Sequence, residues 1–355
     1  MFKLTFGDKK IERKLLLAIL FSILLSIITV GTIYFLIERQ ITVFFLKTFE
    51  AKSLAQLEAY HAGRVADTEN LFRHIFAIAK RFSQDKGFVS ALKSGDMGKA
   101  KELLQRQRLI NQHLESWYVF DKSGKLIVVS SAKPELEAAV GRNFGARDYF
   151  QTVIKTGKPY ISQQLTGVVT GSLFIGFSVP VMNEKKEVAY VLTGSTTLQA
   201  LQDQLELKTR FSYNYNILVD WDYDVLYENG KFVFPQVNLK DTDRIVSRLS
   251  KSSTRLIEEE INYKGERVIA MGDRIQFTSN KESTYYLISY FMKSEFDRQV
   301  MELKQEIRRI FTGISLLIAF VIIATWSLNI WLINLFVTNK RISVEWKNLV
   351  RKLLP

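Results

Sequence analysis

The chain has 355 residues, a formal net charge of +13, no cysteine and a mean hydropathy close to zero. Without cysteine the protein has no disulfide framework and no cysteine-ligated metal centre, so its stability must come from packed cores. The mean conceals two long apolar runs around a polar middle, and the sequence has no basic stripe of the kind that marks a nucleic-acid-binding fold.

Two apolar runs predict membrane-spanning helices. The first, 15–37, extends for 23 residues without a charged side chain, enough for a helix to cross roughly 30 Å of hydrocarbon. The second span is predicted over 306–337. A cleaved signal peptide is the alternative for the first run. Its apolar part exceeds the usual ~7–15 residues of such peptides, and Glu38 and Arg39 follow instead of small residues, so an uncleaved anchor is favoured.

Lysine and arginine residues beside the spans predict the orientation. Because such residues favour the cytoplasmic side, both termini, 1–14 and 338–355, are expected inside. The basic residues on the inner side are Lys3, Lys9, Lys10, Arg13, Lys14, Lys340, Arg341, Lys347, Arg351 and Lys352. Arg308 and Arg309 lie on the other side of the second span and oppose this orientation. We expect residues 38–309 outside the bacterial inner membrane, in the periplasmic or extracellular space, and we ascribe the net charge to contact with anionic lipid rather than nucleic acid.

The segment 38–114 is predicted to be a stalk and a helical segment. Apolar residues and His61 recur there at steps of three or four, and no proline occurs before the one that follows Lys133. This pattern predicts one long helix over 42–81 that continues the first span, and a shorter helix over 97–114.

Two sheet modules are predicted after the stalk. In the first, 115–209, the run WYVFDKSGKLIVVSS is typical of a β-hairpin, and a glycine-rich loop, a short helix, two strands and a helix over 199–207 follow. The second, 210–305, repeats strand, turn and strand, with the turn at 228–230, before a helix and further strands. The predicted fold class is α+β, with two tandem antiparallel modules between two membrane spans.

These elements resemble the double Cache sensor ectodomains of bacterial receptors, in which two PAS-like modules follow a long stalk helix. The matching pieces are WYVFDKSGKLI, GRNFGARDYFQTVIKTGKPYIS, FSVPVMNEKKEVAYVLTGSTTLQAL, YKGERVIAM and STYYLISYFMKSEF. The resemblance implies a membrane-distal module that binds a small molecule, often an organic acid or an amino acid, and passes a conformational change to the membrane. We expect a homodimer in which the stalk helices pair.

The resemblance places ligand-holding residues in the loop GRNFGARDYF, at Arg147 and Tyr149. A guanidinium group can bind a carboxylate through two parallel hydrogen bonds, and aromatic side chains can bury the rest of a small ligand. Further wall or hydrogen-bonding candidates are Trp117, Tyr118, Tyr160, Thr170 and Ser172.

The chain departs from the amino-acid-binding members at two places. Tyr149 and Phe150 replace a tryptophan-tyrosine pair, and Ser195 or Thr196 stands where an aspartate would hold the ligand amine. An ammonium group would lack its counter-charge, so a carboxylate ligand is favoured. A pocket that holds no ligand and has only a structural role is the alternative.

Structural roles compete with these assignments. Arg147 could be a surface residue or could pair with Asp148, which is itself expected to cap or neutralise the helix start. Gly141 and Gly145 are expected to serve turns, and Arg142 is expected in solvent.

Metal and catalytic sites are not predicted. His61 and His74 lie too far apart on one helix to share an ion, and no cysteine or carboxylate cluster completes a site with them or with His113. The sequence has no P-loop, GxSxG or HExxH motif, so we expect neither an enzyme nor a cofactor. Asp220, Asp222 and Asp224 alternate as on a solvated strand face, which we favour over a calcium loop. The tyrosines around Tyr285 are expected to pack in the sheet core.

The tail 338–355 is predicted to form a short amphipathic helix on the membrane or on a partner. It is too short for an output enzyme, so the chain is either part of a longer receptor or a subunit that works with a separate membrane or cytoplasmic signalling partner. The alternative function is an assembly subunit that uses a ligand-free double Cache fold as a scaffold.

Overall fold

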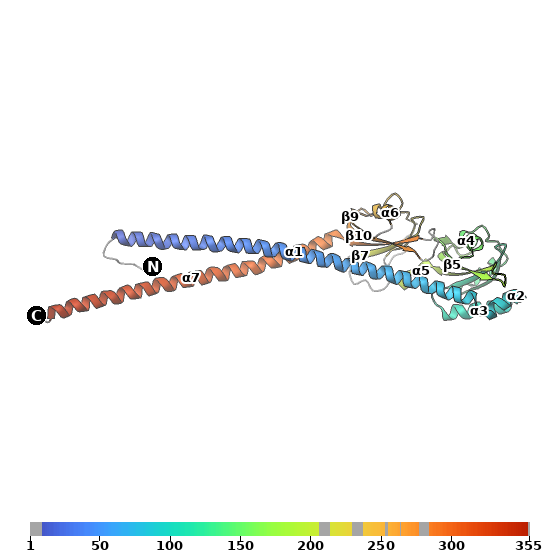
Figure 1. Ribbon diagram of the computed structural model, residues 1–355, viewed down its shortest axis with the longest axis horizontal. Coiled ribbons are helices and arrows are strands. Elements are labelled where there is room, and N and C mark those ends of the chain that lie inside the picture. Colours follow the sequence, from blue (N-terminus) through green and yellow to red (C-terminus); the bar gives the residue numbers. More distant parts are fainter. Residues whose placement is uncertain are drawn as a thin grey trace. The chain divides into compact units, whose positions relative to one another are not determined.

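The computed structural model describes residues 9–205, 214–228, 237–252, 255–262, 264–276 and 284–353 (Figure 1). It divides into two compact units, one formed by Leu54–Phe296 and the other by Met1–Ser53 together with Asp297–Pro355. Each unit is described by itself. The described elements are helices and two antiparallel sheets, which agrees with the predicted α+β class.

The unit made of the two chain ends is helical. It contains the first part of α1 (Lys9–Ser83) and most of α7 (Lys293–Leu353). Both helices are long and apolar enough to cross a membrane, by length and composition. Gly31, Ser315 and Ala319 help to line an apolar cavity of about 270 Å³ between them. Such small residues are typical of closely packed membrane helices.

In the other unit, α1 runs past both sheets from Leu54 onward (Figure 1). Phe72 and Ile75 of this helix are fully buried in the core of the first sheet, and Leu57 packs with Met271 and Phe291 of the second. The long stalk helix predicted over 42–81 is therefore confirmed as part of α1. Two short helices follow it, α2 (Lys86–Ser94) and α3 (Met97–Ile110).

We call the first sheet and its helices the first module. The strand order is β2-β1-β6-β5-β3, and β4 pairs with β5. The strands are β1 (Ser116–Asp121), β2 (Leu126–Ser131), β3 (Tyr160–Ile161), β4 (Leu165–Thr166), β5 (Leu173–Met182) and β6 (Val188–Thr197). The helices are η1 (Pro134–Ala139), α4 (Asp148–Thr156) and α5 (Leu198–Leu205). Residues 206 and 207 of the helix predicted over 199–207 lie outside the described part.

The two faces of this sheet have different partners, because successive strand residues point to opposite faces. Trp117 is fully buried toward the stalk, with its ring centroid 5.7 Å from that of Phe82 on α1. Tyr118 and Phe120 therefore point to the other face, where α4 and η1 lie. Gly194 pairs with Trp117 in the sheet. A larger residue would not fit at this position, because its Cβ would lie 2.7 Å from a methyl group of Leu114.

We call the second sheet and its helix the second module. Its strand order is β8-β7-β11-β10-β9. The elements are β7 (Asn214–Val219), β8 (Val225–Glu228), α6 (Arg244–Leu249), β9 (Leu256–Ile261), β10 (Arg267–Gln276) and β11 (Thr284–Met292). Tyr285 and Tyr290 are fully buried in the cores, as predicted. In the turn predicted at 228–230, only Glu228 lies within the described residues.

Asp220 corrects the prediction of a solvated strand face. β7 ends at Val219, and the Asp220 side chain is fully buried at the junction of the two modules. Its Oδ1 accepts hydrogen bonds from the amides of Asp222 and Asp224, both at 3.0 Å, and its Oδ2 accepts one from the amide of Gln164 at 3.3 Å. The alternating aspartates thus form a turn whose first residue joins the modules.

Candidate functional site

The loop before α4 is fixed against the turn between β1 and β2. The amide of Phe144 donates to the carbonyl of Gly124 at 2.7 Å, and the side-chain amide of Asn143 donates to the carbonyl of Ser123 at 3.0 Å. Gly124 has a φ of +84°, and a Cβ there would lie 2.2 Å from the Cα of Gly145. Both glycines are needed because the two backbones approach so closely.

Arg147 follows this loop and occupies the N-cap position of α4 in an extended conformation, with φ −73° and ψ 140°. Asp148 was predicted to cap the helix or to act as a charge partner at its start. It lies in the first turn, which agrees with the second role and not with a cap, and it accepts a hydrogen bond from the hydroxyl of Tyr160 at 3.0 Å. Since no side chain caps this helix end, Arg147 is placed by the backbone alone.

Arg147 is one of the residues that line a cavity of about 50 Å³ in the first module. The cavity lies over the face of β1 and β6 that points away from the stalk, under η1, the loop before α4 and the segment after β4. Its lining residues are Tyr118, Phe120, Leu126, Leu136, Ala139, Phe144, Arg147, Tyr149, Thr166, Gly167, Val168, Val169, Phe174 and Thr193.

Arg147 is the single charged side chain among these lining residues. Within the described part of the chain it forms no hydrogen bond or ion pair through its guanidinium group, and no carboxylate lines the cavity. Burial raises the pKa of Tyr149, which Arg147 opposes, and burial also raises the pKa of Tyr118. Both phenols are therefore neutral at physiological pH. The site is a largely apolar chamber whose lining contains one charged residue, Arg147.

The structure brings together three of the predicted site residues, Arg147, Tyr149 and Tyr118. Trp117 is not a wall of this cavity, because it faces the stalk on the opposite side of the sheet. This corrects the prediction. A strand residue and its immediate neighbour cannot line the same face.

The remaining predicted residues lie beside the cavity. Tyr160 is buried, with its ring packed edge-on against Trp221 at 6.1 Å between centroids and its hydroxyl on Asp148. Thr170 Oγ1 accepts a hydrogen bond from the amide of Ser172 at 3.2 Å, and Ser172 Oγ accepts one from the ammonium group of Lys133 at 3.1 Å. These residues do not line the cavity, although the adjacent segment 166–169 does.

Several lining residues were not predicted, above all Phe120, Phe144 and Thr193. Phe120 could have been found, since it lies two positions after Tyr118 on the same strand and so shares its face. Thr193 pairs directly with Tyr118 across the sheet, a register that only the fold reveals.

Comparisons with known proteins identify the fold. No protein-family model and no curated protein matches this sequence. Among solved structures, the periplasmic sensory domain of the Campylobacter jejuni chemoreceptor Tlp1 is 12% identical, with a TM-score of 0.50 over 66% of this chain and 92% of that chain. The ligand-binding domain of the Pseudomonas fluorescens chemoreceptor CtaA in complex with L-leucine is 16% identical, with a TM-score of 0.50 over 67% and 94%. Methyl-accepting chemotaxis protein X is 16% identical, with a TM-score of 0.52 over 66% and 95%.

The chain has the fold of the double Cache sensor domains. In one further match, an extracellular ligand-binding receptor from Desulfohalobium retbaense DSM5692, this chain spans 39% of the other protein's length. At such low identities the likeness concerns the double Cache fold alone. Any ligand must therefore be argued from the side chains of this chain.

Proposed function

We propose that this chain is the sensing part of a bacterial inner-membrane receptor, and that its first module binds a small organic carboxylate through Arg147. The observation that carries the proposal is Arg147 in the lining of the cavity, with a guanidinium group that has no hydrogen-bond or ion-pair partner among the described residues. A buried or half-buried charge is costly unless it is paired. A ligand carboxylate would supply the pair in the bidentate geometry that a guanidinium group favours.

The composition of the cavity argues against an amine. CtaA was crystallised with L-leucine, and an amino acid brings an ammonium group that needs an acceptor. The cavity of this chain has no lining carboxylate, and Asp148 turns its side chain to Tyr160. The apolar walls favour a short hydrocarbon body on the ligand. A monocarboxylate fits this chemistry better than an amino acid.

The cavity volume implies that the site opens to admit its ligand. A volume of about 50 Å³ compares with roughly 30 Å³ for one water molecule in the liquid. The segment 166–169 covers the cavity, and Val168 at its tip is 57% exposed. Outward movement of this segment would enlarge the chamber without disturbing the sheet. A ligand that binds the open form would shift the population toward that form.

A route to the membrane exists in the covalent structure. The helix α1 packs on the first sheet through Phe72 and Ile75 and is continuous with the candidate span at its other end. The strand β11 leads directly into α7, which contains the second candidate span. We propose that a shift in the first module displaces these helices in a homodimer with both termini cytoplasmic, and that a separate partner or further domain produces the output.

The small cavity also favours one alternative, an assembly subunit whose first module never opens. In that case the protein would use its surface to bind another membrane protein and would have no small ligand.

Thermal-shift screening of the full chain in detergent tests the proposal against this alternative. The panel contains short organic acids, their neutral amides and amino acids. We expect stabilisation by at least one acid, lost in Arg147→Ala and kept in Arg142→Ala, which removes an exposed arginine from the same loop. If no compound stabilises the chain and it binds another membrane protein tightly, the scaffold function holds and the receptor function is contradicted.

A further inference from the structure

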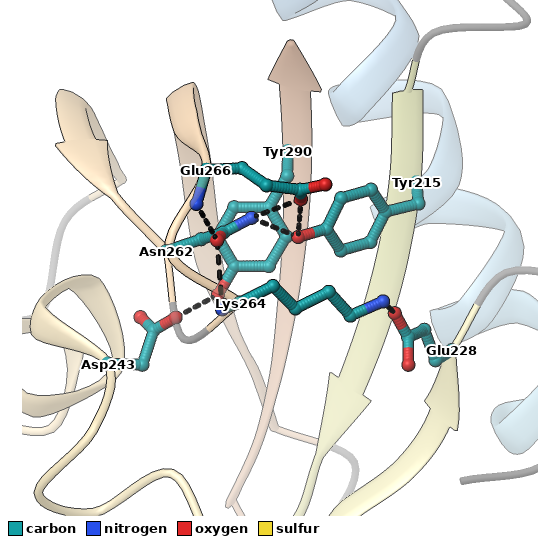
Figure 2. A network of polar contacts seen from close by, with 7 residues as sticks. All are labelled: Tyr215, Glu228, Asp243, Asn262, Lys264, Glu266 and Tyr290. Atoms are coloured by element: carbon teal, nitrogen blue, oxygen red, sulfur yellow. Dashed lines mark hydrogen bonds and ion pairs between the residues drawn. The ribbon is translucent and has the colours of Figure 1, made fainter.

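The second module has a polar cluster on the sheet face that points away from the stalk. Tyr215 and Tyr290 are direct partners on β7 and β11, with ring centroids 5.0 Å apart. Phe291, the next residue, packs with Leu57 of α1, so the tyrosines face the opposite side, where α6 lies. Figure 2 shows the two rings surrounded by Glu228, Asp243, Asn262, Lys264 and Glu266.

One part of this cluster is already an ammonium site. The ammonium group of Lys264 forms a close ion pair with Glu228 and lies 4.8 Å from the centroid of the Tyr215 ring (Figure 2). A carboxylate and an aromatic face together are the usual partners of an alkylammonium group. The Lys264 side chain is 41% exposed, so it can leave this position without unfolding the sheet.

The side chain of Asn262 bridges the turn that carries Lys264. Asn262 Oδ1 accepts hydrogen bonds from the amides of Lys264 and Glu266, both at 2.9 Å. The side-chain amide of Asn262 donates to the hydroxyl of Tyr215 and to Glu266 Oε2. The site therefore keeps its shape when the lysine side chain moves out, because the turn is held by Asn262 and not by the ammonium group.

Two further carboxylates, those of Asp243 and Glu260, lie on this face. Asp243 is buried and accepts a hydrogen bond from the hydroxyl of Tyr290. Glu260 lies on the same face as Tyr290. Glu260 pairs with Val268, and Tyr290 pairs with Ala270. Val268 and Ala270 are two residues apart on one strand and so share a face. Glu260 is 8% exposed, and neither carboxylate oxygen has a hydrogen-bond partner in the described structure.

The surroundings of Glu260 disfavour its charged form. Burial raises the pKa of Glu260 to about 7, with Asp243 and Glu258 adding to the effect and the positive charge of Arg244 opposing it. The amide of Ile245 approaches the carboxylate without forming a hydrogen bond of ordinary geometry and lowers that pKa.

We propose that this face of the second module is a binding site for a small alkylammonium ligand, and that Lys264 occupies its ammonium position when no ligand is bound. Glu228 and the Tyr215 ring hold the ammonium group, while Asp243 and Glu260 provide the negative field. The site is independent of Arg147 and has the opposite charge preference. The two modules would then respond to a carboxylate and to an amine separately.

A rescue experiment on the full chain in detergent tests this proposal. Lys264→Ala keeps Cβ and removes three carbons and the ammonium group, which are the atoms of n-propylammonium. We expect n-propylammonium chloride to raise the melting temperature of this variant, and n-propanol, which lacks the charge, to have no such effect. The wild-type chain should bind the amine about tenfold more weakly or worse, because its own lysine competes.

Four further variants make the result specific. Adding Glu228→Gln to Lys264→Ala should abolish the response, and adding Glu260→Gln should weaken it. Lys251→Ala, which removes an exposed lysine of the same module, should behave as wild type. Arg147→Ala in the Lys264→Ala background should keep the amine response in full, so that failure of the carboxylate site is distinguishable from failure of this one.

The proposal is overturned if Lys264→Ala melts cooperatively and does not respond to n-propylammonium, or responds equally to n-propanol. Should that variant not fold, calorimetric titration of the wild-type chain decides the matter. Weak binding of n-propylammonium that disappears in Glu228→Gln supports the site. The same heat of binding in the wild-type chain and in Glu228→Gln contradicts it.

Discussion

Nδ1 of His61 lies 2.7 Å from Oγ of Ser289, and this contact joins the stalk helix α1 to the centre of the second sheet. Nε2 of the same ring is 3.3 Å from Oδ2 of Asp273, which also pairs with Arg255. Ser289 Oγ donates in turn to Asn216 at 2.6 Å. This polar contact connects the helix to three strands, and it is accompanied by hydrogen bonds from Asn216 to the hydroxyl of Tyr60 and from Arg64 to the carbonyl of Leu205.

This connection predicts a pH dependence of stability. Burial lowers the pKa of His61, which contact with Asp273 opposes. A group whose pKa is lower in the folded state stabilises that state above its unfolded value of about 6.5, and this contribution is lost as the pH falls through the folded pKa. We expect His61→Gln to lower stability by about 1–3 kcal/mol near pH 7 and to reduce the loss of stability between about pH 7 and 5.

Thermal unfolding of the full chain at a series of pH values measures both effects. His74→Gln is the matched control, because His74 lies on the same helix and is exposed. Equal pH profiles for wild type and His61→Gln would show that the buried ring does not titrate on unfolding.

Asp220 predicts a pH effect of the opposite sign. Burial raises its pKa to about 7, which the amides of Asp224 and Gln164 oppose, and the charges of Asp224 and Asp222 add to it. Its stabilising contribution is complete below the unfolded value of about 3.9 and is lost as the pH rises to about 7. Relative to Asp220→Asn, the wild-type chain should therefore become less stable across this range.

The same variant should loosen the junction of the modules, since an amide nitrogen in place of Oδ2 would face the donor of Gln164. Hydrogen exchange at the Gln164 amide, compared between wild type, Asp220→Asn and the exposed control Asp241→Asn, measures this directly. Unchanged protection in Asp220→Asn would rule out a junction role for the carboxylate.

The close backbone contact at Gly124 leads us to expect that one substitution there affects both the stability of the fold and ligand binding. Its substitution by alanine would bring a Cβ within 2.2 Å of the Cα and 2.4 Å of the amide nitrogen of Gly145, which is backbone and cannot turn aside. We expect Gly124→Ala to lower the free energy of unfolding by about 1–3 kcal/mol and to weaken ligand binding by displacing Arg147. Gly98→Ala in α3, where the nearest atom is 3.5 Å away, is the control. Normal ligand affinity in Gly124→Ala would mean that this turn does not position the arginine.

The sequence predicts well which segments are helices and strands, and less well which face of a strand each side chain occupies. Apolar periodicity was enough for α1 and for the alternation of strands, whereas Arg147, Tyr149 and Tyr118 came from the resemblance to double Cache domains. Trp117 was misplaced because the prediction grouped residues by proximity in sequence, whereas a strand separates neighbours.

Long-range contacts account for the other failures. His61 was counted as one apolar position of the stalk, and its partners Ser289 and Asp273 lie more than 200 residues away. Asp220 has the spacing of a strand face, and only the chain reversal after Val219 turns it inward. No local pattern contains the information that Gln164 of the other module meets it.

The central claim is that Arg147 binds the carboxylate of a ligand, and calorimetric titration of the full chain tests it most directly. The titrants are the best acid from the screen and its neutral amide. Since a charged hydrogen-bonded contact contributes about 1.5–3 kcal/mol, the amide should bind at least about tenfold more weakly, and Arg147→Ala should lose binding of the acid while Arg142→Ala keeps it. Equal affinity for acid and amide, or full affinity in Arg147→Ala, would contradict the account.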